Sequence, residues 1–439
     1  MFENLIGQPA LEQIRGDLLQ SRLAPSMLFW GPPASGKGTA ALELARVLSC
    51  EAAGRHYGEW NCGCPACTRY RLLLHPDLLM LGKRNFRMEI AASGAALGRD
   101  WASVSALMLF IRSVRKLMGR FSPVLMEDDS KLSRLNPLLL SLEESLEDIV
   151  SAAPEGRGKI RDSIIQDSGR LEDEGLSAQV PVAQIRKASW WSRLAPQGKR
   201  KFLLIENAGR MQEGARNSLL KILEEPPKNV SILLCSTSRE TILPTLLSRL
   251  RPYRFFQRDD EAEAEVLRRV FRVSEGGNSG GLTGYLESFL PVSDEGLRFL
   301  ACFFIASLAR KAALSLKRAS STLPEPLVSL GKYTASRAEA SGLKAVPDNG
   351  TIIRTVLDKA GNFSEAELFS RFLETLLSQV SACFRDSLRE QAASPAAWLD
   401  LWRRKTADAD SALKIWNLQV PLVLERLCTE LAGGMVTLS

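Results

Sequence analysis

The feature that most constrains the fold of this chain is the glycine-bounded segment 30–39, with the sequence WGPPASGKGT. It follows the apolar residues 27–29 and precedes the helix-favouring run 40–45. A strand, a glycine-containing loop and a helix in this order direct backbone N–H groups and a helix N-terminus at one anion. The segment therefore predicts a phosphate-binding loop in an α/β domain. The alternative is a glycine-rich turn that only joins a strand to a helix.

The loop predicts ATP or ADP binding but leaves Mg²⁺ open. Gly31 and Gly36 allow the backbone to approach the phosphates, and Lys37 can place its charge between the β- and γ-phosphates. The next position normally offers a hydroxyl to Mg²⁺, but here it is Gly38, and Thr39 follows one residue late. The predicted nucleotide-binding residues are Gly31, Ser35, Gly36, Lys37, Gly38 and Thr39.

Cysteines cluster in one neighbourhood of the sequence. Cys50, Cys62, Cys64 and Cys67 supply enough thiolates for one tetrahedral Zn²⁺, and four protein ligands leave no open position for a substrate. We therefore predict a structural zinc site within residues 50–67. The spacing of Cys62 and Cys64 is unusually short, so two alternatives stay open: unligated thiols, or His56 in place of one cysteine.

Length and charge set broad limits. A chain of 439 residues predicts two or three domains. A net charge of +7 and a pI near 9.0 are too mild by themselves to indicate nucleic-acid binding. The apolar stretch 299–309 is shorter than the roughly 20 residues that cross a bilayer, and the N-terminus lacks a basic signal region. These features predict a cytoplasmic protein without a membrane segment.

Helical periodicity dominates two parts of the chain. Residues 86–178 read as an inserted helical hairpin with a charged linker over 153–175, and no chemistry is evident in it. Beyond residue 290, helices are predicted over 297–316, 369–388 and 412–431.

The predicted strand 202–205 ends in Glu206-Asn207. An acidic residue at the end of a buried strand is where P-loop proteins hold Mg²⁺, and many place a water-activating carboxylate next to it. Asn207 cannot accept a proton at neutral pH, which predicts weak or absent hydrolysis. The alternative is that Glu206 and Asn207 only cap the following helix.

Several motifs together resemble one family, the bacterial clamp-loader subunits of the AAA+ class, namely the delta-prime and gamma/tau subunits of DNA polymerase III. The resemblance covers residues 1–85 and 180–260, and more loosely the helical C-terminal part. Its motifs are Phe2, Gly7-Gln8, the phosphate loop, the cysteine cluster, His75-Pro76-Asp77, Asn217, Leu223-Glu224-Glu225-Pro226-Pro227 and Ser248-Arg249.

The resemblance implies roles for single residues. Glu206-Asn207 is similar to the delta-prime form of the acidic motif, and Thr237 falls at the sensor position that reads the γ-phosphate in gamma. Arg249 falls at the arginine that family members project into a neighbour's ATP site, although Leu250 replaces the usual cysteine. The alternative for Arg249 is a surface arginine that ends a helix. The segment 274–284 lacks the second-sensor arginine of ATPase subunits.

The fold implied by this resemblance has three parts. Residues 1–255 form an α/β AAA+ P-loop domain with a parallel sheet, residues 256–292 a small helical lid, and residues 293–439 an all-α collar. The implied partners are gamma/tau and delta clamp-loader subunits in a hetero-oligomeric ring, the sliding clamp, and primed DNA through the complex.

Two rival functions stay open. A catalytically active gamma/tau-type ATPase is favoured by the intact loop from Gly31 to Lys37. A nucleoside-monophosphate kinase is indicated by residues 36–39, but it fails on chain length and on the lack of an arginine-rich acceptor lid.

Overall fold

A computed structural model describes most of the chain. The described residues are 1–127, 129–177, 179–274, 281–290, 292, 294–318, 322–340, 365–385, 393–414 and 418–438. They divide into two compact units, Met1–Phe289 and Leu290–Ser439. The predicted division into three domains at residues 255 and 292 stays a prediction.

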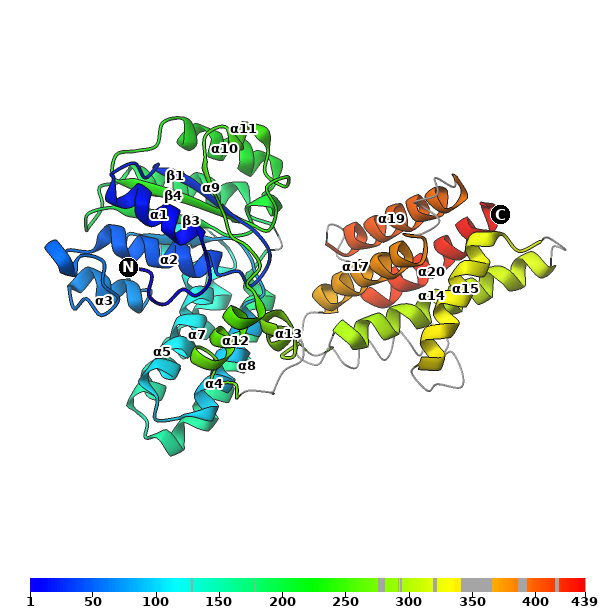
Figure 1. Cartoon of the computed structure of the whole chain (residues 1–439), viewed down its shortest axis with the longest axis horizontal. Coiled ribbons are helices and arrows are strands. Elements are labelled where there is room, and N and C mark those ends of the chain that lie inside the picture. Colours follow the sequence, from blue (N-terminus) through cyan, green and yellow to red (C-terminus); the bar gives the residue numbers. More distant parts are fainter. Residues whose placement is uncertain are drawn as a thin grey trace. The chain divides into compact units, whose positions relative to one another are not determined.

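A five-stranded parallel sheet organises the first unit (Figure 1). The strand order is β2-β3-β4-β1-β5. The bounds are β1 Ser26–Trp30, β2 Leu78–Leu81, β3 Lys201–Ile205, β4 Val230–Ser236 and β5 Arg251–Arg254. Sequence patterns did not predict β5, because it is short and contains Pro252. Proline is tolerated there because β5 is an edge strand that pairs with β1 alone.

Helices cover both faces of the sheet. Met27 and Phe29 point into the core beneath α1 (Ala10–Leu19) and α2 (Lys37–Ser49), whereas Leu28 faces the opposite core. That second core is closed by α9 (Val182–Arg193), α10 (Glu213–Glu224) and the short α11 (Pro244–Leu247). The alternation follows from the two-residue period of a strand, which sends successive side chains to opposite faces.

The predicted insertion is a helical subdomain with its own core. Its helices are α4 Phe86–Arg99, α5 Val104–Met118, α6 Pro123–Met126, α7 Leu132–Ser151 and α8 Arg157–Gly175. The expected charged linker over 153–175 is wrong, because most of it is α8. This helix buries a narrow face, where the Glu172 carboxylate accepts hydrogen bonds from the backbone N–H groups of Phe86 and Arg87 (3.2 and 2.9 Å).

The helices after the sheet are fastened to this insertion. The α12 (Asp260–Arg269) and α13 (Gly281–Glu287) helices share a core with Ala92 of α4. The Arg99 guanidinium donates to the Phe271 carbonyl (3.0 Å) and to the Tyr285 hydroxyl (2.9 Å). Residues 275–280 of the predicted lid segment lie outside the described residues.

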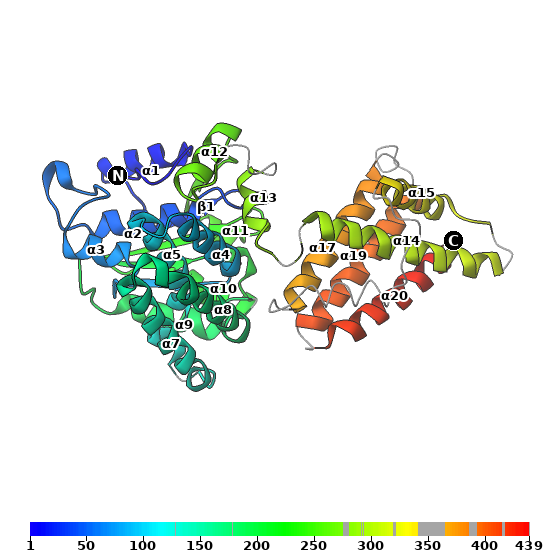
Figure 2. The ribbon, with the colours of Figure 1, turned by 90° about the horizontal axis from the view of Figure 1, so that it is seen from below.

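The regular structure among the described residues of the second unit is helical (Figure 2). Its helices are α14 Asp294–Arg318, α15 Glu325–Ala340, α17 Glu365–Cys383, α19 Ala393–Lys414 and α20 Val420–Thr437. The single helix predicted over 412–431 is wrong, because that range joins the end of α19 to α20. The predicted helix 369–388 extends into residues 386–388, which lie outside the described part.

Among the described residues, one helix segment, Gly296–Arg318, is long and apolar enough to cross a membrane by length and composition. The core helix of a soluble bundle passes the same test, and 56% of its apolar window is buried within the protein. The parallel α/β domain that the sequence predicted is present, and the described residues of the C-terminal part form helices, as predicted.

Candidate functional site

The phosphate loop requires its two outer glycines. A Cβ on Gly31, whose φ is +150°, would lie 2.1 Å from the Phe255 carbonyl oxygen. Gly36 has φ +91° and is the N-cap of α2, a left-handed position that favours glycine. The loop therefore joins β1 to α2 in the strand, loop, helix order that the sequence predicted.

The Lys37 ammonium is occupied by its own loop. It donates to the carbonyls of Gly31 (2.6 Å) and Pro32 (2.5 Å) and to the Ser35 hydroxyl (3.1 Å). An ammonium has three N–H donors, so this arrangement uses all of them. Burial lowers the pKa of Lys37 to about 8. A phosphate group would have to displace these acceptors before it could bind the lysine.

Arg258 lies over the same loop and was not predicted. Its side chain donates to the carbonyls of Ile6 (2.9 Å) and Ala34 (2.6 Å). A Cβ on Gly36 would lie 2.8 Å from an Arg258 nitrogen, so the guanidinium packs directly on the loop. No local pattern signals this contact, because Arg258 and Ile6 lie at opposite ends of the domain sequence.

Glu206 reaches the phosphate loop from the end of β3. A Cβ on Gly38 would lie 2.6 Å from Glu206 Oε1, so the structure brings these two predicted site residues together. Glu206 is 7% exposed and forms ion pairs with Arg84 (3.5 Å) and with Arg120. Two guanidinium groups thus pair with the carboxylate that stands where P-loop proteins hold Mg²⁺.

The insertion supplies part of this charge network. Arg120 belongs to the single turn η2 (Gly119–Phe121), and Lys116 and Arg84 both pair with Glu89 of α4. Burial alone would raise the pKa of Glu89, but these two cations outweigh it and hold the pKa at about 2. The insertion, in which no chemistry was evident from the sequence, thus places charged side chains beside Glu206.

Asn207 does not act as the predicted helix cap. It adopts the left-handed conformation (φ 50°) before the turn η4 (Ala208–Arg210), and its side chain makes no cap hydrogen bond. Its Nδ2 donates instead to the Lys83 carbonyl (2.5 Å). Thr237, the predicted sensor, is an exposed residue immediately after β4.

Arg249 lies on the surface at the end of α11. Its guanidinium donates to the Thr245 carbonyl (2.7 Å), the Ser248 hydroxyl (3.1 Å) and the Glu224 carboxylate (2.9 Å). The Arg249 and Glu224 side chains are 33% and 50% exposed. These contacts come from α10 and α11.

The four clustered cysteines meet in space. The Sγ atoms of Cys50, Cys62, Cys64 and Cys67 all lie within 4.8 Å of one another. Four converging thiols match the ligand set of a structural zinc site. The His56 ring pairs with Glu59 (3.1 Å) and its side chain is 60% exposed. The structure therefore places four cysteine thiols, and not the His56 ring, at the candidate metal site.

Arg46 fastens the cysteine segment to α2. It is 1% exposed and pairs with Glu43 through two hydrogen bonds of 2.9 and 2.6 Å. It also donates to the carbonyls of Gly58 and Glu59 (both 2.8 Å) and to Cys67 Sγ (3.1 Å). Removing one partner of a buried ion pair typically costs about 3–5 kcal/mol. The Glu43/Arg46 spacing of three residues within an apolar helix was the available sequence signal.

The His75-Pro76-Asp77 motif has a structural role here. The His75 ring stacks on Tyr70 (4.3 Å between centroids), and its Nδ1 accepts the Asp77 backbone N–H (3.1 Å). The Asp77 carboxylate accepts the N–H groups of Gln197 (3.0 Å) and Gly198 (2.7 Å). The motif therefore joins the entry to β2 with the entry to β3.

Comparisons with known proteins agree with this architecture. The family described as "DNA polymerase III, delta subunit" matches residues 139–259, which include residues 139–178 of the insertion. A Buchnera aphidicola protein named DNA polymerase III subunit delta' is 47% identical over 55 residues, which cover 12% of this chain and 16% of that protein. A Pseudomonas aeruginosa protein of the same name is 39% identical over 80 residues, 18% of this chain and 24% of its own length.

A third relative is the Mycobacterium bovis protein named DNA polymerase III subunit gamma/tau. It is 28% identical over 109 residues, which cover 25% of this chain and 18% of that protein. The chain thus matches less than a quarter of the length of each of these three relatives.

Fold and site together define a parallel α/β domain with a glycine-bounded loop between β1 and α2, followed by a unit whose described residues form helices. The matches confirm the resemblance to the clamp-loader subunits of DNA polymerase III, of the delta-prime and gamma/tau kind.

Proposed function

We propose that this chain is a clamp-loader subunit of the delta-prime type. It acts in the cytoplasm within a hetero-oligomeric ring with gamma/tau and delta subunits, which loads the sliding clamp onto primed DNA. Its own ATPase is weak or absent, and it contributes Arg249 to a neighbouring ATP site. Its cofactor is one structural Zn²⁺.

The observation that supports the delta-prime assignment is the position of the Glu206 carboxylate and its pairing with two arginines. The carboxylate faces Gly38, where a metal-binding hydroxyl would normally stand, and pairs with Arg84 and Arg120. A cation at this position would compete with two guanidinium groups, and Asn207 beside it cannot serve as a base. This combination supports a partner subunit more than a self-contained ATPase.

Co-purification tests the assignment. A tagged copy of the full chain, expressed in its native host, is expected to recover DNA polymerase III clamp-loader and polymerase subunits, identified by mass spectrometry. The control is an unrelated tagged P-loop protein, which should not recover them. Recovery of the chain alone, as a monomer that turns over ATP, would reject the proposal.

The isolated chain is expected to bind ATP or ADP weakly to moderately and to hydrolyse it negligibly. Lys37 remains available only after leaving its three loop acceptors, and no carboxylate stands at position 207. The measurements are calorimetric titration with each nucleotide and steady-state phosphate release. Turnover near the typical enzyme median of about 10 s⁻¹ would contradict this expectation.

The variant Asn207→Glu separates two causes of this inactivity. If the missing base is a limiting part, the variant gains measurable turnover. If the ion pairs of Glu206 alone prevent metal binding, the variant stays inactive. The gamma/tau rival, which the intact loop favours, predicts turnover already in the unaltered chain. The kinase rival predicts phosphotransfer from ATP to a mononucleotide.

A further inference from the structure

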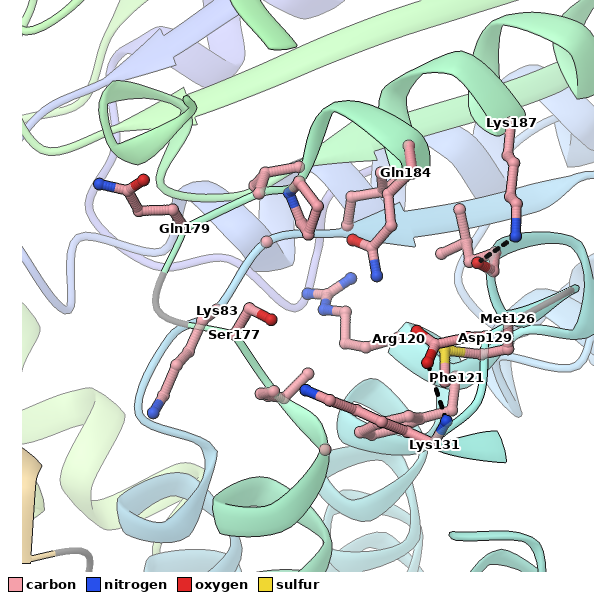
Figure 3. Close-up of a pocket in the computed structure, with 18 of the residues that line it drawn as sticks. Lys83, Arg120, Phe121, Met126, Asp129, Lys131, Ser177, Gln179, Gln184 and Lys187 are labelled. Atoms are coloured by element: carbon pink, nitrogen blue, oxygen red, sulfur yellow. Dashed lines mark hydrogen bonds between the residues drawn. The ribbon is translucent and has the colours of Figure 1, made fainter. Parts of the chain in front are cut away.

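A cavity of about 270 Å³ opens beside the carboxyl end of β2 (Figure 3). Its walls come from the β2 exit at Gly82–Lys83, from η2 and α6, from the end of α8, and from the start of α9. None of the predicted site residues lines it. Its volume lies near the lower limit of small-molecule sites, which begin at roughly 300 Å³.

Arg120 is the central polar group of this cavity. The residue is 3% exposed, and one guanidinium nitrogen, Nη2, pairs with Glu206. Its Nε and Nη1 are buried and have no hydrogen-bond partner among the residues that the structure describes. Burial lowers the pKa of Arg120 to about 10, which still leaves the guanidinium charged at neutral pH.

Unpaired donors of this kind call for a ligand. A buried donor without a partner costs about 1–3 kcal/mol, and more when the group is charged. Such groups in folded proteins are normally explained by an ordered water or an ion. The fork of N–H donors on a guanidinium matches two oxygens of a phosphate or carboxylate.

The remaining polar lining favours an anion. Lys83, Lys131 and Lys187 contribute to the walls, and Asp129 is the one acidic residue in the described lining. The Lys187 ammonium already donates to the carbonyls of Leu125 (3.4 Å) and Glu127, so Lys83 and Lys131 supply the remaining positive charge. Figure 3 shows Arg120 in the middle of the opening with the Gln184 side chain pointing toward it. Gln184 adds a neutral amide donor beside the guanidinium.

We propose that this cavity binds a small phosphate-bearing anion, with Arg120 as the principal ligand and Gln184 and Lys131 as supporting contacts. Both nitrogens are almost fully enclosed in the described conformation, so the guanidinium has to turn slightly toward the cavity for the bound oxygens to reach Nε and Nη1, while Nη2 keeps Glu206. The limited volume restricts the ligand to inorganic phosphate or a small phosphomonoester. This site is separate from the phosphate loop and does not depend on the proposed role in the ring.

Calorimetric titration of the full chain with inorganic phosphate, at constant ionic strength, tests the proposal. Arg120→Gln is expected to weaken phosphate binding by about tenfold or more, as for the loss of a charge-assisted contact. Because this change also touches Glu206, the double variant Lys131→Gln/Gln184→Leu provides an independent test that leaves the ion pair intact. It is expected to weaken binding by at least several-fold.

Two controls locate the binding. Lys37→Ala removes the lysine of the phosphate loop, and Lys159→Gln removes an exposed charge on α8 that does not line the cavity. Lys159→Gln is expected to bind phosphate as the unaltered chain does, and Lys37→Ala, which disables the phosphate loop, is expected to keep the binding that the cavity variants lose. Loss of binding in Lys37→Ala with retention in both cavity variants would overturn the proposal, as would the absence of any binding at millimolar phosphate.

A parallel titration with glycerol 3-phosphate separates the two sources of the anion. Tighter binding than inorganic phosphate, lost in the cavity variants, supports a phosphomonoester. Equal or weaker binding, also lost in those variants, supports the free ion.

Discussion

Arg249→Ala is expected to lower ATP hydrolysis by about 10³-fold or more at the one neighbouring site that the arginine completes in a reconstituted clamp-loader ring. Arginine fingers contribute factors of 10³–10⁵ because the guanidinium stabilises charge on the transferring phosphoryl group. The measurement is clamp- and DNA-stimulated ATPase of the assembled complex. Nucleotide affinity of the isolated chain is expected to stay unchanged.

The surroundings of Arg249 allow its side chain to move from Glu224 to a nucleotide on a neighbouring subunit. Its ion pair with Glu224 is partly exposed, and exposed pairs contribute only about 0–1 kcal/mol. The guanidinium can therefore leave Glu224 for a partner's nucleotide at little cost.

Two variants sharpen this test. Arg249→Lys is expected to rescue little, because a single point charge does not reproduce a planar fork of donors. Arg251→Ala is a matched control, since Arg251 is also exposed (60%) and lies two residues further along the chain. If Arg249→Ala abolished nucleotide binding by the isolated chain and spared the complex, Arg249 would act in its own subunit.

Removal of metal is expected to unfold the segment 50–67 and to lower the thermal midpoint of the first unit. Structural Zn²⁺ supplies about 10–16 kcal/mol of apparent binding free energy in peptides that fold around it. Without a cation, four thiols would crowd within 4.8 Å of one another beside the buried Arg46. We expect one zinc per chain by elemental analysis of protein purified without chelator.

Single cysteine variants check the ligand set. Cys67→Ser is expected to lose the metal, whereas Cys383→Ser, in the C-terminal unit, is expected to keep it. A chain purified without any zinc would contradict the prediction of a metal centre. If Cys62→Ser kept full metal, another ligand, such as His56, would complete the site.

Local sequence patterns predicted the parts of the site that lie on one continuous segment. The order of apolar strand, glycine loop and helix was sufficient to place the loop between β1 and α2, and close sequence spacing was sufficient to group the four cysteines. Both are local arrangements, so neither depends on how distant segments pack.

Contacts between distant segments could not be predicted in this way. Arg120 and Glu206 are 86 positions apart, and their pairing depends on how the insertion folds against β3. The α8 helix was mistaken for a linker because it buries Ser168, Gly169 and Glu172 among few apolar residues. Its stability comes from specific contacts, such as the hydrogen bonds that the backbone N–H groups at the start of α4 donate to Glu172, which periodicity does not record.

The closed hydrogen-bond set of Lys37 has a consequence for nucleotide occupancy. A ligand that needs the lysine can bind only the fraction of molecules in which the ammonium has left Gly31, Pro32 and Ser35. Apparent affinity falls in proportion to that fraction, so a released state populated at about 1% weakens binding roughly 100-fold. Any contact in an assembly that draws the lysine outward would raise nucleotide affinity without touching the nucleotide itself.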